Sequence, residues 1–326
     1  MENEILLDIE NLWVKYSTDD GIVNALNGVS LKLKKSETFG LVGETGAGKT
    51  TLAKAIMSLI PSPPGKITDG KILFREEDLL KCTPERIRDI RGKDISMIFQ
   101  DPMTSLNPVM KIGDQIKEVI ETHNPKMSDS ELNKKVVEML NLVGISADRT
   151  NEYPHQFSGG MKQRVIIAIA LACNPLLLIA DEPTTALDVT IQAQVLEMVR
   201  DLKKKLNTSM ILITHDLGVV VQNCDKVAIV YAGEILEVGT LRELFKNPLH
   251  PYTKGLFDSI PSLVKESKRL KPIEGLMPDP TDLPKGCSFC PRCKFALEKC
   301  KTETPDPIQR EGEHQVKCFL YEQGNR

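Results

Sequence analysis

The pattern of apolar and polar positions predicts strands that alternate with helices over most of the chain. Apolar runs of strand length occur at residues 5–15, 28–33, 38–42, 95–99, 176–180 and 209–214. Apolar residues recur at helical spacing at residues 49–59, 112–120, 132–143, 160–172 and 191–206. Residues 227–231 and 234–237, separated by Ala232 and Gly233, predict a β-hairpin. The pattern therefore indicates an α/β fold with a largely parallel sheet covered by helices.

Two stretches depart from this alternation. Residues from about 101 to 160 carry helical periodicity with polar linkers, which predicts an α-helical subdomain inserted in the α/β body. Beyond residue 247 prolines recur, at Pro248, Pro251, Pro261, Pro272, Pro278, Pro280 and Pro284. We therefore expect a main domain at residues 1–247 and an extended appendage at 248–326, weakly held by a core of its own.

Charge and hydropathy narrow the classes of partner. The net charge of −3 comes without a long basic run, which argues against nucleic acid as the main partner. Residues 1–10 do not have the apolar stretch of an export signal, and no segment approaches the ~20 apolar residues of a membrane span. We expect a cytosolic protein whose partners supply any membrane-spanning helices.

A glycine-rich turn after the run at 38–42 carries the strongest chemical signal. The pattern G-x-x-x-x-G-K-[ST] is matched by Gly43, Glu44, Thr45, Gly46, Ala47, Gly48, Lys49 and Thr50. Such a loop turns backbone N–H groups toward phosphate oxygens at a helix N-terminus. Lys49 is expected at the β- and γ-phosphates, Thr50 at Mg²⁺ and Thr51 at the α-phosphate. The alternative, an ordinary glycine-rich turn, is disfavoured by the flanking strand and helix.

The buried strand predicted at 176–180 ends in two acids, Asp181 and Glu182. Many buried strands end in an acid, but downstream of a phosphate loop the pair predicts ATP hydrolysis. Asp181 is expected to hold the Mg²⁺ shell through water, and Glu182 to act as general base toward the attacking water.

The run FSGGMKQR at 157–164 lies between a loop and a helix. By itself Ser-Gly-Gly is typical of a helix cap. Before an acid-ended strand, it resembles the signature motif of ABC ATPases, from whose commonest form, Leu-Ser-Gly-Gly-Gln, Phe157 and Met161 depart. The resemblance implies that the Ser158 hydroxyl and the Gly159 and Gly160 amides bind a γ-phosphate.

The same resemblance implies a P-loop NTPase fold of the ABC-ATPase type, with a mostly parallel core sheet, an antiparallel β subdomain, an α-helical subdomain and a cysteine-rich C-terminal extension. It also implies roles for further residues. Gln100 is similar to the Q-loop glutamine that touches Mg²⁺ and the attacking water. Ala186-Leu187-Asp188 resembles the D-loop, and His215 the switch histidine that contacts the γ-phosphate. Tyr16 resembles the aromatic residue that stacks on adenine, although Trp13 is nearby and a strand aromatic is more often part of a core.

ABC ATPases work as head-to-tail dimers, so the resemblance implies that ATP binds between the loop at 43–50 of one subunit and Ser158–Gly160 of the other. The partner is expected to be a related second ATPase, with a homodimer as the alternative. A soluble ABC ATPase and a regulatory module without turnover are competing classes. The single cassette disfavours the first, and Glu182 with His215 disfavours the second.

Longer stretches narrow the resemblance to the dipeptide and oligopeptide importers, a group that includes some nickel importers. These are QDPMTSLNP at 100–108, YPHQFSGG at 153–160 and NPLHPYT at 247–253. The resemblance implies a peripheral subunit on the cytoplasmic face of the membrane, working with two transmembrane permeases and indirectly with an extracytoplasmic peptide-binding protein. Import of nickel or another small solute stays open, because substrate choice belongs to the other subunits.

The appendage ends in a group of cysteines, which without an export signal suggests metal rather than disulfides. The group comprises Cys287, Cys290, Cys293, Cys300 and Cys318. The spacing alone leaves a [4Fe–4S] cluster, Zn²⁺ and unligated thiols open. The family resemblance implies a [4Fe–4S] cluster on Cys287, Cys293, Cys300 and Cys318, with Cys290 as an extra thiol.

Overall fold

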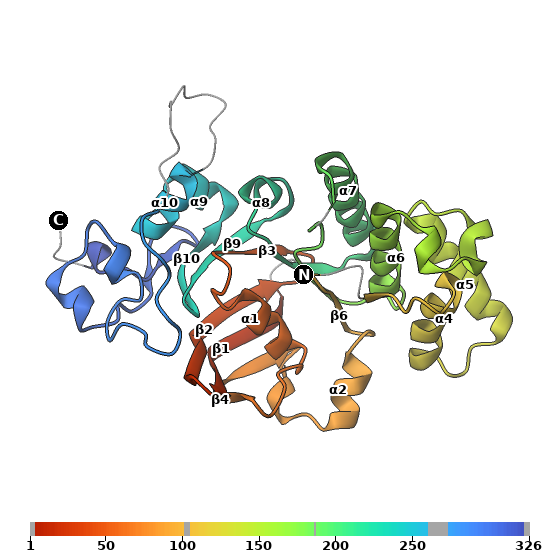
Figure 1. Ribbon diagram of the computed structural model, residues 1–326, viewed down its shortest axis with the longest axis horizontal. Coiled ribbons are helices and arrows are strands. Elements are labelled where there is room, and N and C mark those ends of the chain that lie inside the picture. Colours follow the sequence, from red (N-terminus) through yellow and green to blue (C-terminus); the bar gives the residue numbers. More distant parts are fainter. Residues whose placement is uncertain (1–3, 101–104, 186, 260–272, 323–326) are drawn as a thin grey trace. The chain divides into compact units, whose positions relative to one another are not determined.

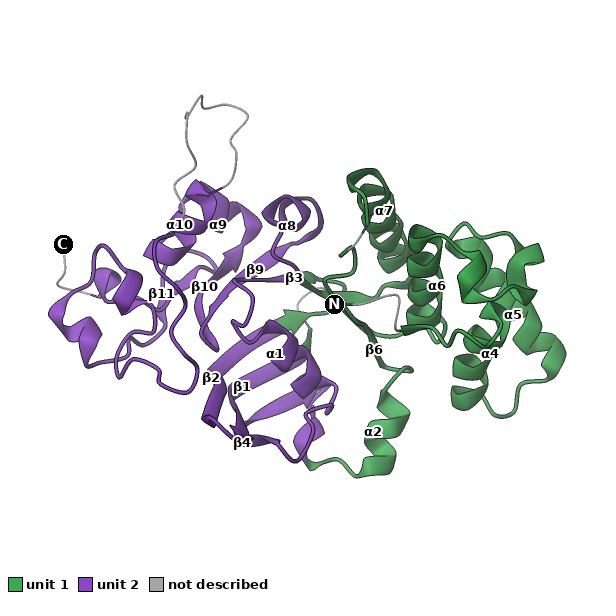
Figure 2. Ribbon diagram, in the orientation of Figure 1, with its two compact units in different colours: residues 1–6, 33–38, 81–213 green, residues 7–32, 39–80, 214–326 purple. Residues whose placement is uncertain are grey.

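The computed structural model describes residues 4–100, 105–185, 187–259 and 273–322 (Figure 1). The chain divides into two compact units that alternate along the sequence (Figure 2). Unit 1 contains residues 1–6, 33–38 and 81–213, and unit 2 contains residues 7–32, 39–80 and 214–326. The domain boundary expected at residue 247 was drawn from the sequence, and neither compact unit begins or ends there. It therefore stays a prediction.

Unit 2 contains the antiparallel part of the fold. One sheet has the strand order β2-β1-β4-β5, and β4 runs antiparallel to β1 and to β5. Its strands are β1 (Ile5–Thr18), β2 (Gly21–Lys34), β4 (Gly65–Phe74) and β5 (Glu77–Asp78). The expected antiparallel subdomain is confirmed, although the sequence pattern predicted neither β4 nor β5.

A second run of strands in unit 2 has the order β11-β12-β10-β9-β3. The strands are β3 (Thr38–Val42), β9 (Lys226–Tyr231), β10 (Glu234–Thr240), β11 (Ile308–Gln309) and β12 (Gln315–Val316). β3 pairs parallel with β9, whereas β9, β10, β12 and β11 pair antiparallel in turn. The predicted hairpin of β9 and β10 is confirmed.

The helices of unit 2 are short. They are α1 (Lys49–Ile56), α8 (Leu217–Asn223), α9 (Leu241–Lys246) and α10 (Pro251–Asp258). Single 3₁₀ turns follow at Cys290–Arg292, Glu298–Lys301 and Phe319–Tyr321. The appendage that begins at residue 248 is called the C-terminal segment below. It is anchored by pairing of β12 with β10 and by a small apolar cluster of Leu249, Val316 and Cys318.

Unit 1 contains a parallel sheet of order β8-β7-β6. Its strands are β6 (Ile95–Ile98), β7 (Leu177–Asp181) and β8 (Ser209–Ile213), and every residue in them is buried. Burial on both faces explains why these segments are continuous apolar runs rather than alternating ones. The predicted parallel core is confirmed for these strands.

Helices make up most of the remainder of unit 1. They are α2 (Pro84–Ile90), α4 (Ile112–His123), α5 (Asp129–Leu142), α6 (Gly159–Leu171) and α7 (Val189–Leu206). 3₁₀ turns at Ala147–Asn151 and Pro154–Gln156 precede α6. Helices α4 and α5 confirm the helical periodicity predicted for this stretch, whereas its assignment as a separate subdomain stays a prediction. Residues 101–104 of the expected Q-loop stretch lie outside the described residues.

Candidate nucleotide-binding and active site

The glycine-rich loop joins β3 to α1, as the sequence pattern predicts (Figure 1). The Lys49 ammonium donates to the carbonyls of Gly43, at 2.8 Å, and of Glu44, at 2.9 Å. Lys49 therefore ties the start of the loop to the first turn of α1. With only 7% of its surface exposed, this cation is positioned before any ligand arrives.

Two glycines of this loop are sterically required. A Cβ on Gly43 would lie 2.1 Å from the Val230 carbonyl oxygen, and Gly48 has a φ of 101° with the Ala25 carbonyl oxygen 2.6 Å from an added Cβ. A side chain at either position would force backbone apart. The turn between β3 and α1 thus depends on backbone contacts with β2 and β9.

Residues of the C-terminal segment, which the sequence pattern did not identify as site residues, also hold this loop. The Tyr252 hydroxyl accepts a hydrogen bond from the Glu44 amide, at 3.2 Å, and Arg292 forms an ion pair with the Glu44 carboxylate, at 2.9 Å. Tyr252 lies within the family-like stretch at 247–253, so a signal for it existed. Arg292, 248 residues from Glu44, had none.

Tyr16 and His215 also belong to unit 2. Tyr16 is half-buried on β1, opposite Gly65 of β4, where a Cβ on Gly65 would lie 2.7 Å from its ring. His215 is exposed and lies between β8 and α8. Tyr16 therefore packs against Gly65 within the strand pair. This contact does not test its predicted role at adenine, which stays a prediction.

The acid pair follows β7 in unit 1. Asp181 is buried, and the half-buried Glu182 leaves the strand with a φ of 47°. Glu182 Oε2 accepts from Gln100 Nε2 and from the Thr185 hydroxyl, each at 3.0 Å. The structure thus brings together two residues that were each expected to act on the attacking water, although a direct hydrogen bond between them was not predicted.

The Ser-Gly-Gly segment opens α6, also in unit 1. The Ser158 hydroxyl caps the helix by accepting from the Met161 amide, and the Asp188 carboxylate caps α7 by accepting from the Ile191 amide at 3.0 Å. Ser158, Gly159, Gly160 and Asp188 line one pocket. The signature-like and D-loop-like residues are therefore neighbours, while Ala186 lies outside the described residues.

The C-terminal cysteines lie in unit 2, and burial raises the pKa of the Cys287 thiol to about 12 and that of Cys318 to about 11. Neighbouring thiols contribute to both shifts, Cys300 among them. Across the part of the chain that the structure describes, however, there is no group of three or more His, Cys, Asp or Glu side chains arranged to hold a metal ion. The predicted [4Fe–4S] cluster and its zinc alternative therefore have no support in this geometry.

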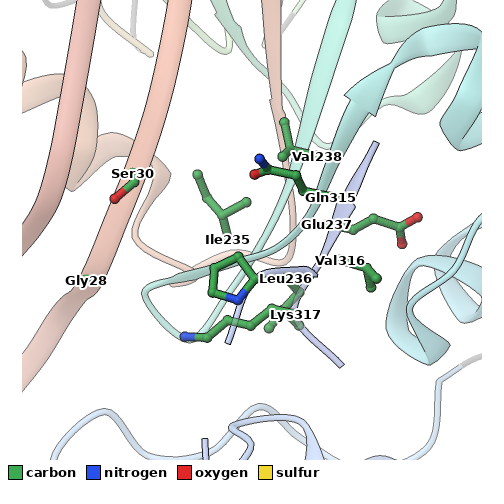
Figure 3. Close-up of a pocket in the computed structure, with 10 residues that line it drawn as sticks. Gly28, Ser30, Ile235, Leu236, Glu237, Val238, Gln315, Val316 and Lys317 are labelled. Atoms are coloured by element: carbon green, nitrogen blue, oxygen red, sulfur yellow. The ribbon is translucent and has the colours of Figure 1, made fainter. Parts of the chain in front are cut away.

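A separate pocket of unit 2 lies beside β2, β10 and β12, where Figure 3 shows Ser30, Ile235 to Val238 and Gln315 to Lys317. None of the predicted site residues lines it. Among the described residues, no helix has the length and apolar character needed to cross a membrane.

Comparisons with known proteins relate this chain to transport ATPases. Residues 26–185 match the family model described as ABC transporter, and residues 236–300 match the one described as oligopeptide/dipeptide transporter, C-terminal region. The chain is 50% identical over 322 residues to the dipeptide transport ATP-binding protein DppD of Bacillus subtilis, covering 98% of this chain and 96% of that protein. It is 51% identical over 318 residues to the oligopeptide transport ATP-binding protein OppD of the same organism, covering 97% and 88%.

The fold also resembles a solved structure. This is the dimeric, post-hydrolysis state of the ATP-binding cassette MJ0796 bound to ADP and phosphate, with a TM-score of 0.65 and 27% identity. The match covers 72% of this chain and 99% of the cassette.

Proposed function

The chain belongs to the ATP-binding subunits of dipeptide and oligopeptide ABC transporters, and from this premise we propose that Glu182 is the general base of its ATP hydrolysis. The chain has the ABC ATPase cassette fold, and it hydrolyses ATP to power peptide import. The observation that carries the proposal is the pair of hydrogen bonds from Gln100 and Thr185 to the Glu182 carboxylate.

The proposed step is an in-line displacement at the γ-phosphorus. The water oxygen bonds to phosphorus while the bond to the β–γ bridging oxygen breaks, and its electron pair leaves with ADP. Glu182 takes the proton from the attacking water. The hydrogen bonds from Gln100 and Thr185 hold the Glu182 carboxylate in one orientation. A general base must be held within hydrogen-bond distance of the water whose proton it takes.

The nucleotide is bound by the remaining predicted residues. Tyr16 stacks on adenine, the amides of residues 43–50 and Lys49 hold the phosphates, Thr51 contacts the α-phosphate, and His215 contacts the γ-phosphate. Lys49 supports this proposal most directly, because it is already held in place inside the loop. Bound Mg²⁺ would neutralise charge on the β- and γ-phosphates, and the oxygens of Thr50, Gln100 and Asp181 are the hard donors that it prefers.

The active unit is a dimer. ABC importer ATPase subunits dimerise and work with membrane permeases. The Ser158 hydroxyl and the Gly159 and Gly160 amides, at the N-terminus of α6, suit an anion, and the pocket they line with Asp188 is open to one. We assign this pocket to the γ-phosphate of the nucleotide held by the partner's loop, the partner being a related second ATPase, with an identical chain as the alternative.

The transport role extends this proposal to the membrane. Two permeases receive the motion of the dimer at the cytoplasmic face, and an extracytoplasmic peptide-binding protein delivers the substrate. The relatives support peptides as the transported substrate, since their names specify dipeptide and oligopeptide transport. A nickel or other small-solute importer would use the same ATPase chemistry.

Replacing Glu182 with Gln tests whether Glu182 is the general base. We expect phosphate release to fall by about two orders of magnitude or more, because the amide cannot accept the proton. ATP binding should persist in Glu182→Gln and be lost in Lys49→Ala. The matched control is Glu197→Gln on α7, an exposed acid paired with Arg200, which should hydrolyse ATP normally. Unchanged turnover in Glu182→Gln would refute the assignment of the base.

The [4Fe–4S] cluster on Cys287, Cys293, Cys300 and Cys318 is a separate proposal, with Zn²⁺ as its alternative. Its support is the resemblance to the dipeptide and oligopeptide importers and the burial of the Cys287, Cys300 and Cys318 thiols, although the described residues contain no group of side chains arranged to hold a metal ion. Anaerobically purified protein is expected to contain iron and acid-labile sulfide and to absorb near ~400 nm. Cys300→Ser should abolish the signal, and Cys290→Ser should retain it. Zinc without sulfide would favour the alternative, and neither metal would exclude both.

A further inference from the structure

The ion pair between Arg292 and Glu44 joins the cysteine-rich segment to the glycine-rich loop. Arg292 Nη1 lies 2.9 Å from Oε1 and 3.1 Å from Oε2 of the Glu44 carboxylate. The Arg292 side chain is only 6% exposed and that of Glu44 is 32% exposed. Because the pair is largely withdrawn from solvent, removing one partner leaves an uncompensated charge next to the loop.

Other contacts fix the guanidinium of Arg292 in place. Its Nη1 also donates to the Tyr231 hydroxyl, at 3.3 Å, and its Nε donates to the Glu274 carbonyl, at 3.0 Å. Nη2 donates to the Ile273 carbonyl, at 3.4 Å. A rigid fork with this many acceptors loses little freedom when it binds a carboxylate, which a flexible lysine ammonium would not reproduce.

The backbone of Glu44 is held from the same side. Its amide donates to the Tyr252 hydroxyl at 3.2 Å, and Tyr252 is fully buried. The Tyr252 ring packs against Tyr231, with centroids 4.7 Å apart, and against Phe289, at 5.3 Å. Phe289 precedes the 3₁₀ turn that contains Arg292, so a single aromatic group supports both contacts to Glu44.

Glu44 also contacts Lys49, the positively charged residue of the loop. Its carbonyl accepts from the Lys49 ammonium at 2.9 Å, while its side chain pairs with Arg292. A shift of Glu44 therefore displaces Lys49. In addition, an unpaired Glu44 carboxylate would repel the polyphosphate that the loop binds.

We propose that Arg292 is a positioning residue of the nucleotide site, acting through Glu44 to shape the phosphate-binding loop and to neutralise its only acidic side chain. Tyr252 acts with it on the Glu44 amide. The C-terminal segment is thereby part of the ATP-binding apparatus. This inference rests on the proposed assignment of residues 43–50 to phosphate binding.

The test measures binding of a fluorescent ATP analogue with Mg²⁺, and steady-state hydrolysis, on the purified full chain. Arg292→Ala is expected to raise Kd and KM for the nucleotide about tenfold, a size typical of coupling between contacting residues, with kcat changed less than about twofold. Arg292→Lys should fall between it and the wild type. If Arg292→Ala only left part of the protein unfolded, the apparent kcat would fall because less enzyme is active, and KM would stay unchanged.

A double-mutant cycle isolates the ion pair. Glu44→Gln is expected to weaken binding less than Arg292→Ala, and combining the two changes should recover part of the lost affinity, because no unpaired carboxylate is left. Should Arg292→Ala fail to fold, Glu44→Gln and Arg292→Lys carry the test. Unchanged Kd and KM in all these variants would overturn the inference.

Lys294→Ala is the matched control. Lys294 forms an exposed ion pair with Glu274 between the same two parts of the C-terminal segment, so its loss should leave Kd unchanged. An equal loss of affinity in Lys294→Ala would also overturn the inference. Lys49→Ala in the same assay separates the two proposals. If it binds nucleotide normally, the assignment of the loop is wrong, whereas normal binding only in the Arg292 and Glu44 variants refutes the positioning role alone.

Discussion

At the scale of single residues, the buried carboxylate of Glu237 organises the junction between β10 and the C-terminal segment. It accepts from the amides of Leu249 and His250, each at 2.8 Å, and contacts Nε2 of His314 at 2.7 Å. Glu237 is 1% exposed, so these contacts replace its hydration. They fix the start of α10, from which Tyr252 reaches the loop.

The adjacent His250 makes this junction sensitive to acid. Burial lowers the pKa of His250 to about 3, and its Nδ1 accepts a hydrogen bond from the Tyr252 amide at 3.1 Å. Since this pKa lies below the value of about 6.5 in an unfolded chain, the unfolded state binds the extra proton as the pH falls below that value. The free energy of unfolding should then decrease by about 1.4 kcal/mol per pH unit from this residue.

His250→Asn tests the sign and size of this effect. Asparagine can still cap α10 but does not titrate. Between pH 6.5 and pH 5 the wild type should lose about 2 kcal/mol more stability than the variant, measured by urea unfolding. His155→Asn, at an exposed position, is the control. Equal pH slopes in the wild type and in His250→Asn would contradict the prediction.

At the scale of elements, predictions succeeded where periodicity was strong and failed where boundaries depend on backbone detail. The buried strands β6, β7 and β8 and the helices α4 to α7 follow their apolar patterns. Helix α1 was expected to reach residue 59 but ends at Ile56. Ser58 adopts a φ of 51°, and the amides of Ser58 and Leu59 return to the carbonyls of Ala55 and Lys54. This C-terminal capping pattern usually uses glycine, so a serine at this position does not signal it.

The same limit applies to β4 and to the site. β4 contains Gly70 with a φ of 102° and pairs with β1 through register shifts near Trp13, which obscures the two-residue period of a strand. Gln100 and Glu182 were each identified because both belong to recognisable motifs, but the hydrogen bond between them was not predicted. The pairing of Arg292 with Glu44 follows no local pattern, because tertiary packing alone brings these residues together.

At the scale of the whole molecule, the predicted chemistry is divided between the two compact units. Residues 43–50, Tyr16 and His215 belong to unit 2, whereas Gln100, Asp181, Glu182 and Ser158–Gly160 belong to unit 1. In the proposed dimer each nucleotide is held by the loop of one chain and the Ser-Gly-Gly segment of the other. Each chain therefore contributes to both sites.

Mixing two defective variants tests this composite site. In the Glu182→Gln background, Lys49→Ala destroys the loop, and Ser158→Glu places a negative charge where the γ-phosphate is expected. A dimer of either variant alone contains no intact site. A mixed dimer contains one, built from the loop of the Ser158→Glu chain and the Ser-Gly-Gly segment of the Lys49→Ala chain.

For the homodimer alternative, we expect ATP-dependent dimers in the mixture but not in either variant alone, measured by light scattering after size exclusion. They should be weaker than Glu182→Gln dimers, because one nucleotide rather than two joins the chains. If Glu182→Gln dimerises and the mixture does not, the composite site is wrong. If Glu182→Gln itself stays monomeric with ATP, the identical chain is not its partner. The same variants should then be paired with the related ATPase, where the loop of one chain and the Ser-Gly-Gly segment of the other must both be intact for dimers to form.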